Sequence, residues 1–288
     1  MAVVYALTRK EDKRRYLMKV RIKFQKYGAM KFIGHLDVMR YFQKAFRRAG
    51  YESEYSKGYN PHQIMSFAAP LGLGITSDGE YLDAELVRAE DPVIMIKKLN
   101  DVMTEGFHIT GFKVLKDREE NQKAVSAMSL MDVADYLVSL KDGYDINSSI
   151  IDQESFKKVF DKFLEQDSID IVKKTKKNET NVNIKPMIKV VAYDKKEFQE
   201  KLATVVKETP IKAVNYESVA EAFDNGILVY LQVSSSSAEN LKPELVMEAF
   251  YDYLQLEFNK FAWQIHRLEI YTRDEETKRL IPLDENER

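Results

Sequence analysis

The 288-residue chain contains no cysteine at all. Disulfide bonds are therefore excluded, as are zinc sites with thiolate ligands and the usual cysteine-held iron–sulfur clusters. Long apolar runs are also missing, since no segment approaches the roughly 18 apolar residues that predict a membrane-spanning helix. The first 15 residues place an apolar segment before a basic one and show no cleavage-site pattern, so no signal peptide is expected. We predict a cytoplasmic protein that does not enter a membrane, without a cofactor or a metal.

Acidic residues are scarce in the first part of the chain, although the net charge of the whole sequence is only −2. Residues 1–60 hold 15 lysines and arginines against five acidic residues. The first 15 residues could form a solvated basic arm, but residues 16–60 still hold 10 basic against three acidic residues. Basic charge concentrated in one segment is expected of a surface that binds a polyanion such as nucleic acid.

Hydrophobic periodicity predicts the same order of elements twice. "YLMKVRIKF" (16–24) alternates apolar and mostly basic residues, which is typical of a half-buried strand. "HLDVMRYFQKAFRRAG" (35–50) has helical spacing, and its apolar stripe consists of Leu36, Met39, Phe42, Phe46 and Ala49. Two further strands, a helix that begins at Asp91 and Pro92, and a last strand complete a β-α-β-β-α-β unit.

We therefore predict an α+β fold made of two tandem ferredoxin-like units, each with an antiparallel sheet. The first, basic unit spans residues 1–115, a polar linker spans 116–129, and the second unit spans 130–271. The second unit is expected to contain a helical insertion at about 196–222. Residues 272–288 are expected to form a solvated tail.

Basic side chains in the first unit are candidates for binding phosphate groups. Four of them fall at i, i+4, i+7 and i+8 of the predicted helix, opposite its apolar stripe: Arg40, Lys44, Arg47 and Arg48. Arg21 and Lys23 lie on the basic side of the first strand and extend this set. Several such contacts would give salt-dependent affinity for RNA, whereas the alternative is an ordinary solvated helix face. Only Asp37 interrupts the basic residues, which favours phosphate binding.

The segment "YSKGYNPHQIMSFAAPLGLG" (55–74) concentrates glycine and proline, and it predicts a loop of defined shape between two strands. Its first part offers candidate contacts to an RNA base or to a partner protein: Tyr55, Lys57, Tyr59, Asn60 and His62. Asn60 precedes Pro61 and is therefore biased toward extended geometry, which would fix the direction of His62. Aromatic rings in loops commonly stack on unpaired bases.

Two histidines are weak candidates for chemistry. His35 stands just before the first helix and His62 stands in the loop, so with Asp37 they could form a metal site or a general acid–base pair. In the structural alternative, His35 caps the helix and His62 packs within its loop. We favour this alternative because no fixed ligand spacing such as H-x-x-x-H is present. No catalytic or metal-binding residue is therefore predicted beyond these three weak candidates.

The segment from Arg21 to Leu86 closely resembles the opening of the radical-SAM-linked protein family, a bacterial domain. The matching motifs are "GHLD" (34–37), "RRAG" (47–50), "YSKGYNPH" (55–62), "PLG" (70–72) and "EYLD" (80–83). Gly34 stands where this family usually has serine, and Tyr59 where it usually has phenylalanine. The later segments "KKNETNVNIKPMI" and "LKPELVMEAF" also fit, so the resemblance spans nearly the whole chain.

The resemblance implies an association with a radical SAM protein that has a cobalamin-type domain and is encoded nearby or fused. Because the chain has no cysteine, it cannot hold the iron–sulfur cluster that this chemistry needs and is not itself the radical enzyme. We therefore expect a non-catalytic accessory protein that presents a substrate, structured RNA by hypothesis, to that enzyme.

Two other functions stay open. The chain could be an RNA-processing enzyme that uses His35 and His62, because tandem ferredoxin-like units also resemble CRISPR-type RNA endonucleases. Those enzymes have a glycine-rich loop near the C-terminus, whereas residues 227–288 contain no glycine, which argues against cleavage. The chain could also be a protein–protein scaffold that binds no nucleic acid.

Overall fold

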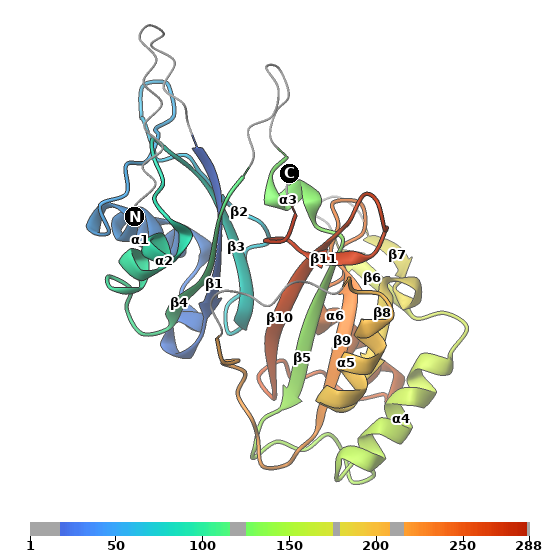
Figure 1. Ribbon diagram of the computed structural model, residues 1–288. Helices are drawn as coiled ribbons and strands as arrows, with labels where there is room; N and C mark the ends of the chain where they lie inside the picture. The colour runs from blue at the N-terminus through green and yellow to red at the C-terminus, as the bar shows by residue number, and fades with distance from the viewer. Residues whose placement is uncertain (1–17, 116–124, 175–178, 208–215, 287–288) are drawn as a thin grey trace, which may run out of the picture.

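Nine of the described strands, from both halves of the chain, join in one sheet, and two further strands pair only with each other, as the computed structural model shows (Figure 1). The structure describes residues 18–115, 125–174, 179–207 and 216–286. The N-terminal half contains β1 (Met18–Lys26), η1 (Gly28–Phe32), α1 (His35–Arg48), β2 (Met65–Phe67), β3 (Thr76–Leu86), α2 (Pro92–Asn100) and β4 (Phe107–Val114). The C-terminal half contains α3 (Ala127–Leu130), β5 (Val133–Leu140), α4 (Gln153–Glu165), β6 (Asp170–Lys174), β7 (Glu179–Asn183), η2 (Lys185–Met187), β8 (Ile188–Ala192), α5 (Lys195–Ala203), β9 (Leu228–Ser234), α6 (Pro243–Tyr253), β10 (Trp263–Arg273) and β11 (Leu280–Pro282).

The nine-stranded sheet has the order β4-β1-β3-β10-β5-β9-β8, with β2 added to β3 and β11 added to β10. Every pair is antiparallel except β3–β10, which is parallel and joins the two halves through Thr76–His266 and Ser77–Arg267. The predicted α+β class with a mostly antiparallel sheet is confirmed. The two separate sheets that we expected are in fact one. The description as tandem ferredoxin-like units stays a prediction.

Helices α1 and α2 cover one face of the N-terminal strands. Val20, Ile22 and Phe24 of β1 point to this face and pack in one cluster with the buried side chains of both helices. The expected helical stripe is largely correct, since Phe42 and Phe46 are buried. Leu36, however, is 64% exposed, because it lies in the first turn of α1, beyond the edge of this core.

The opposite face of these strands, which we call the polar face, carries Lys19, Arg21 and Lys23 of β1 together with Tyr81, Asp83 and Glu85 of β3. Cross-strand register places Arg21 opposite Asp83 and Lys19 opposite Glu85. In the C-terminal half, α4 and α6 pack on the side of the sheet that carries Ala134, Tyr136 and Val138 of β5. Helix α5 packs on the other side, where Phe198 stacks on Tyr230 at a ring-centroid distance of 5.1 Å.

The C-terminal residues are not a solvated tail, which corrects our prediction for 272–288. Strand β10 continues to Arg273, and a turn closed by a hydrogen bond from Asp274 N to Arg279 O brings β11 back beside it. Leu280, Ile281 and Leu283 are 3%, 6% and 0% exposed. Three apolar residues in "LIPL" are too short a pattern to reveal a strand, yet their burial fixes this segment on the protein. Residues 287–288 lie outside the described part.

Among the described residues of the predicted helix at about 196–222, only those up to Ala203, where α5 ends, are helical. Residues 208–215 lie outside the described part, as do 1–17, 116–124 of the predicted linker and 175–178. Residues 216–221 are irregular and lie against the polar face, where Val219 N and Ser218 Oγ donate to Asp78 at 2.9 and 2.5 Å. Within the described residues, no helix is long and apolar enough to cross a bilayer.

Candidate functional site

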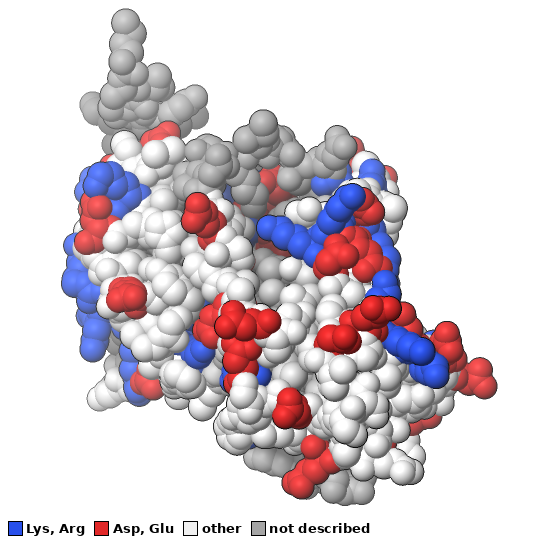
Figure 2. Space-filling view, turned by 90° about the horizontal axis from the view of Figure 1, so that it is seen from below, with Lys and Arg blue, Asp and Glu red and all other residues white. Residues whose placement is uncertain are grey.

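Helix α1 exposes the four cations that the sequence places on one side: Arg40, Lys44, Arg47 and Arg48. Its other side is buried through Val38, Phe42, Ala45 and Phe46, so the 3.6-residue period keeps the basic side in water. Figure 2 shows lysines and arginines gathered along one edge of the molecule, the side on which α1 lies in Figure 1. The helix face itself is therefore accessible to an anionic ligand.

Two of these four cations have contacts that hold them in place. Arg40 Nη1 lies 3.2 Å from Asp37 Oδ1, but both side chains remain about two-thirds exposed. Arg48 donates to Val102 O at 3.1 Å, and its guanidinium lies 5.7 Å from the centre of the Tyr41 ring. Among the residues that the structure describes, Lys44 and Arg47 form no ion pair. Their charge is therefore not neutralised within the described part of the chain.

Arg21 and Lys23 are not available to bind phosphate, which corrects our prediction. Both side chains are 0% exposed. Arg21 donates to both oxygens of Asp83, at 2.8 and 3.0 Å, and to Leu283 O at 3.0 Å, while Lys23 is paired with Glu269. Residues 216–221 and the C-terminal segment (280–286) cover the part of the polar face around Arg21 and Lys23, so these two cations of β1 point into the protein. The alternating pattern of residues 16–24 showed that β1 has an apolar and a basic face, but it could not show which face is exposed to solvent.

The loop at residues 55–63 has a fixed neck and an exposed tip. Tyr55 and Gln63 form an isolated β-bridge, and Ser56 N donates to His62 O at 2.8 Å. The His62 ring is also held here, with Nδ1 2.8 Å from Ser56 Oγ. Tyr59 is fully exposed at the tip. Exposed positions in this loop also include Tyr55, Lys57, Asn60 and His62.

The structure gives each weak catalytic candidate a separate contact. The His35 ring packs edge-on against Phe67 at a centroid distance of 5.2 Å, whereas the His62 ring contacts Ser56 Oγ and Asn60 O within its own loop. Asp37 pairs with Arg40. His35 does not cap α1, because the N-cap is Gly34 and no side chain caps the helix there. No group of three or more histidine, aspartate or glutamate side chains that could hold a metal occurs within the described residues.

A buried ionic cluster under the C-terminal segment is the feature that the sequence analysis missed. The Tyr81 hydroxyl lies 2.6 Å from Glu269 Oε1 and 2.9 Å from Asp284 Oδ1, so its single proton is held between two carboxylates, and Glu269 also pairs with Lys23. Burial, together with the negative charges of Asp284 and Glu269, raises the pKa of Tyr81 well above its ordinary value, so the hydroxyl remains a donor. Burial alone would lower the pKa of Lys23, but the same two carboxylates raise it well above its usual value. The cluster therefore keeps Lys23 charged.

The carboxyl of Asp135 on β5 is buried beside this cluster and accepts a hydrogen bond from Gln232 Nε2 at 2.9 Å. Burial raises the pKa of Asp135 to about 7. Hydrogen bonds from Gln232 and Tyr271 lower this pKa but only partly offset the effect of burial. Its ordinary value in an unfolded chain is about 4, so the folded protein holds this proton more tightly. Stability is therefore lost as the pH rises from about 4 through about 7.

Replacing Asp135 with asparagine is expected to remove this loss of folding stability with rising pH. Asparagine has the shape of a neutral carboxyl and can still accept from Gln232, so the stability of the variant relative to the wild type should rise between pH 5 and pH 8, where the wild-type carboxyl ionises in the folded protein. This rise should be about 1–3 kcal/mol. Urea unfolding at both pH values measures the difference. Equal loss of stability at pH 5 and pH 8 would contradict the assignment.

Residues 19–243 match the family described as "Uncharacterized protein conserved in bacteria (DUF2344)", and the chain belongs to this family. The resemblance noted above is confirmed at that level, and the association with radical SAM proteins stays a prediction. No curated protein matches the chain. A solved structure, "Crystal Structure of an Unknown Protein from Galdieria sulphuraria", is 9% identical over 87% of this chain and 97% of that chain, but its TM-score of 0.22 supports no argument.

Proposed function

We propose that the protein is a non-catalytic accessory module that binds RNA through α1 and the loop at 55–63. The observation that supports this most is the exposed face of α1, with Arg40, Lys44, Arg47 and Arg48 on one side of a rigid helix and a single carboxylate, Asp37, among them. Phosphate groups are the natural ligands of such a face, because each contact releases counterions from the nucleic acid.

The loop supplies a second kind of contact. Its neck is held by the Tyr55–Gln63 bridge and by Ser56 and His62, so an aromatic ring at the tip can bind with little loss of conformational freedom. Tyr59 is exposed there and offers both faces of its ring to an unpaired base. Residues 49–54 connect the end of α1 to this loop and are held against the end of β3 by the Ser53–Leu86 bridge, so the connection between the basic helix and the loop is itself fixed.

The radical SAM enzyme enters this proposal through the sequence resemblance alone. The chain has no cysteine for an iron–sulfur cluster, so a second protein would have to supply the radical chemistry. We also infer that the two halves are ferredoxin-like units in the cytoplasm. Their strand orders support the fold, because β4-β1-β3-β2 and β10-β5-β9-β8 both follow the order 4-1-3-2 with antiparallel neighbours.

The test is binding of the purified protein to total bacterial RNA over a range of salt concentrations. Changing Arg40, Lys44, Arg47 and Arg48 together to alanine should abolish tight binding and make log K fall less steeply with log salt, by about 3, since each single-strand phosphate contact contributes about 0.7. A matched control removes four exposed cations that already have acidic partners: Arg88, Lys97, Lys98 and Lys201.

Both variants lose the same charge, so general attraction to RNA falls equally and only a defined site separates them. Equal weakening in the two variants, or no wild-type binding at low salt, would refute the proposal and favour the protein–protein scaffold. Replacement of Tyr59 with alanine tests the loop separately, since loss of one stacked base costs about 1–3 kcal/mol.

A further inference from the structure

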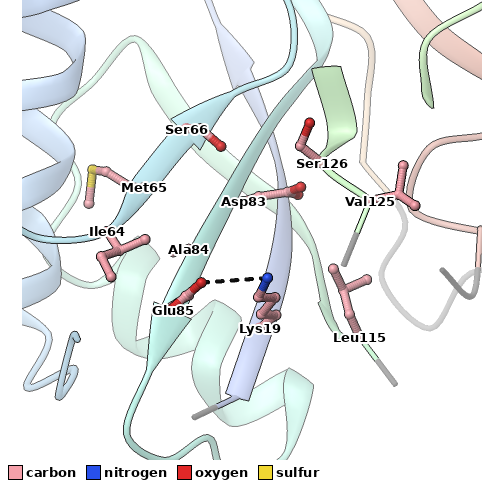
Figure 3. A pocket seen from close by; sticks show the side chains of 10 residues that line it. All are labelled: Lys19, Ile64, Met65, Ser66, Asp83, Ala84, Glu85, Leu115, Val125 and Ser126. Carbon is pink, nitrogen blue, oxygen red and sulfur yellow. Dashed lines mark ion pairs between the residues drawn. The ribbon is translucent and has the colours of Figure 1, made fainter. Parts of the chain in front are cut away.

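A small pocket of about 130 Å³ opens at the outer end of the polar face, beside the edge strand β2 (Figure 3). Ile64 and Met65 lie on one side of it, and Leu115 and Val125 lie on the other. Its polar lining consists of Lys19, Ser66, Asp83, Glu85 and Ser126. Pockets for drug-sized ligands usually measure about 300–1,000 Å³, so this one suits a much smaller molecule.

The charges in the pocket are not equally available. Both oxygens of Asp83 accept from the buried guanidinium of Arg21, and Oδ2 also accepts from Ala127 N at 2.7 Å. The charge of Asp83 is therefore neutralised by Arg21 inside the protein. Lys19 and Glu85 form only a loose pair, with 3.6 Å between Nζ and Oε1 and side chains 41% and 21% exposed. A ligand thus meets one ammonium and one carboxylate, whose charges sum to zero.

We propose that this pocket binds a free aliphatic α-amino acid as its zwitterion. The ligand ammonium would take the place of Lys19 beside Glu85, and the ligand carboxylate would pair with Lys19. The aliphatic side chain would lie between the apolar walls, where each Å² removed from water contributes about 25 cal/mol. Opening the Lys19–Glu85 pair costs little, since exposed ion pairs contribute about 0–1 kcal/mol.

The balance of charge distinguishes a zwitterion from other small ligands. A simple amine would pair with Glu85 but leave Lys19 without a partner in a partly buried site, and a simple carboxylate would leave Glu85 unpaired. Each unpaired charge weakens binding because its desolvation is not compensated. The pocket is separate from α1, so this inference does not depend on RNA binding.

The experiment is a titration of the full-length protein with L-leucine, followed by calorimetry or by NMR chemical shifts. Saturable binding is expected, and glycine, L-leucinamide and N-acetyl-L-leucine should each bind at least about tenfold more weakly, because they lack the side chain, the carboxylate and the ammonium respectively. The variants Lys19→Met and Glu85→Gln should each weaken leucine binding by a similar factor. Glu90→Gln, which breaks the exposed Lys98–Glu90 pair outside the pocket, is the matched control and should bind as the wild type does.

The two pocket variants should keep the wild-type melting temperature within a few degrees, because they break a loose surface pair. Three outcomes would overturn the proposal: no saturable binding of leucine at tens of millimolar, equal binding of leucine and leucinamide, or unchanged binding in both Lys19→Met and Glu85→Gln.

Discussion

Replacing Lys23 with methionine is expected to destabilise the protein by about 3–5 kcal/mol, because removal of one partner of a buried ion pair leaves the other charge uncompensated. Lys23 is fully buried and pairs with Glu269, while Asp284 lies close enough to raise its pKa. The methionine variant would keep the volume of the side chain but leave two carboxylates under the C-terminal segment without this cation. Urea unfolding at neutral pH measures the loss.

A double variant separates the charge from the packing. Adding Glu269→Gln to Lys23→Met removes one of the uncompensated carboxylates and should recover at least part of the lost stability. Lys97→Met breaks the exposed Lys97–Asp101 pair and should change the stability by less than about 1 kcal/mol. If Lys23→Met is no more destabilising than Lys97→Met, the cluster does not stabilise the fold as described.

Ending the chain after Arg279 is expected to have the largest effect on stability. The deletion exposes the surfaces covered by Leu280, Ile281 and Leu283, and full burial of each such side chain is worth about 1.5–3 kcal/mol. It also removes the carbonyl that accepts from Arg21 and the carboxylate that accepts from Tyr81. We expect a loss above about 5 kcal/mol, seen as a protein that is unfolded or aggregates at 37 °C.

A point substitution tests the same segment where the truncated chain fails to fold. Leu283→Ala should cost about 2–5 kcal/mol, since Leu283 is 0% exposed. Leu36→Ala makes the same chemical change at a side chain that is 64% exposed, and it should cost less than about 0.5 kcal/mol. Similar losses in the two variants would contradict the role that we assign to the C-terminal segment.

Short-range sequence patterns predicted the secondary-structure elements whose formation depends on neighbouring residues. The alternation in 16–24 located β1, and the helical spacing after His35 located α1 with its exposed cations. The same alternation could not show which side of β1 is buried, because the residues that cover Arg21 and Lys23 come from the other end of the sequence. A useful signal was present in "EYLDAEL", where Asp83 and Glu85 repeat with the same period as the cations of β1. Charges that alternate on two neighbouring strands indicate cross-strand ion pairs rather than a ligand surface.

In the candidate site, too, features that depend on local sequence could be predicted, whereas contacts between distant segments could not. The side of α1 that faces water follows from its own sequence. The glycine and proline of residues 55–74 identified the loop at 55–63, but not the short strand β2 (Met65–Phe67), which lies inside the predicted loop. The pocket beside β2 could not be predicted, because Lys19, Asp83 and Val125 meet there only through strand pairing and the start of α3. The irregular course of 216–221 was also hidden, since it depends on hydrogen bonds to Asp78 on a distant strand.

The parallel pair β3–β10 has a consequence for how the chain folds during synthesis. The N-terminal half leaves the ribosome first, but the partners of its buried cations come last: 246 residues separate Lys23 from Glu269 and 262 separate Arg21 from Leu283. Contacts across such separations form slowly because the closure of the long intervening loop precedes any gain. Until then, the polar face of the nascent N-terminal half is open to water with its lysine and arginine exposed. Completion of the fold therefore waits for the final strand, and a ribosome stalled before β10 would carry a half-sheet that a chaperone has to protect.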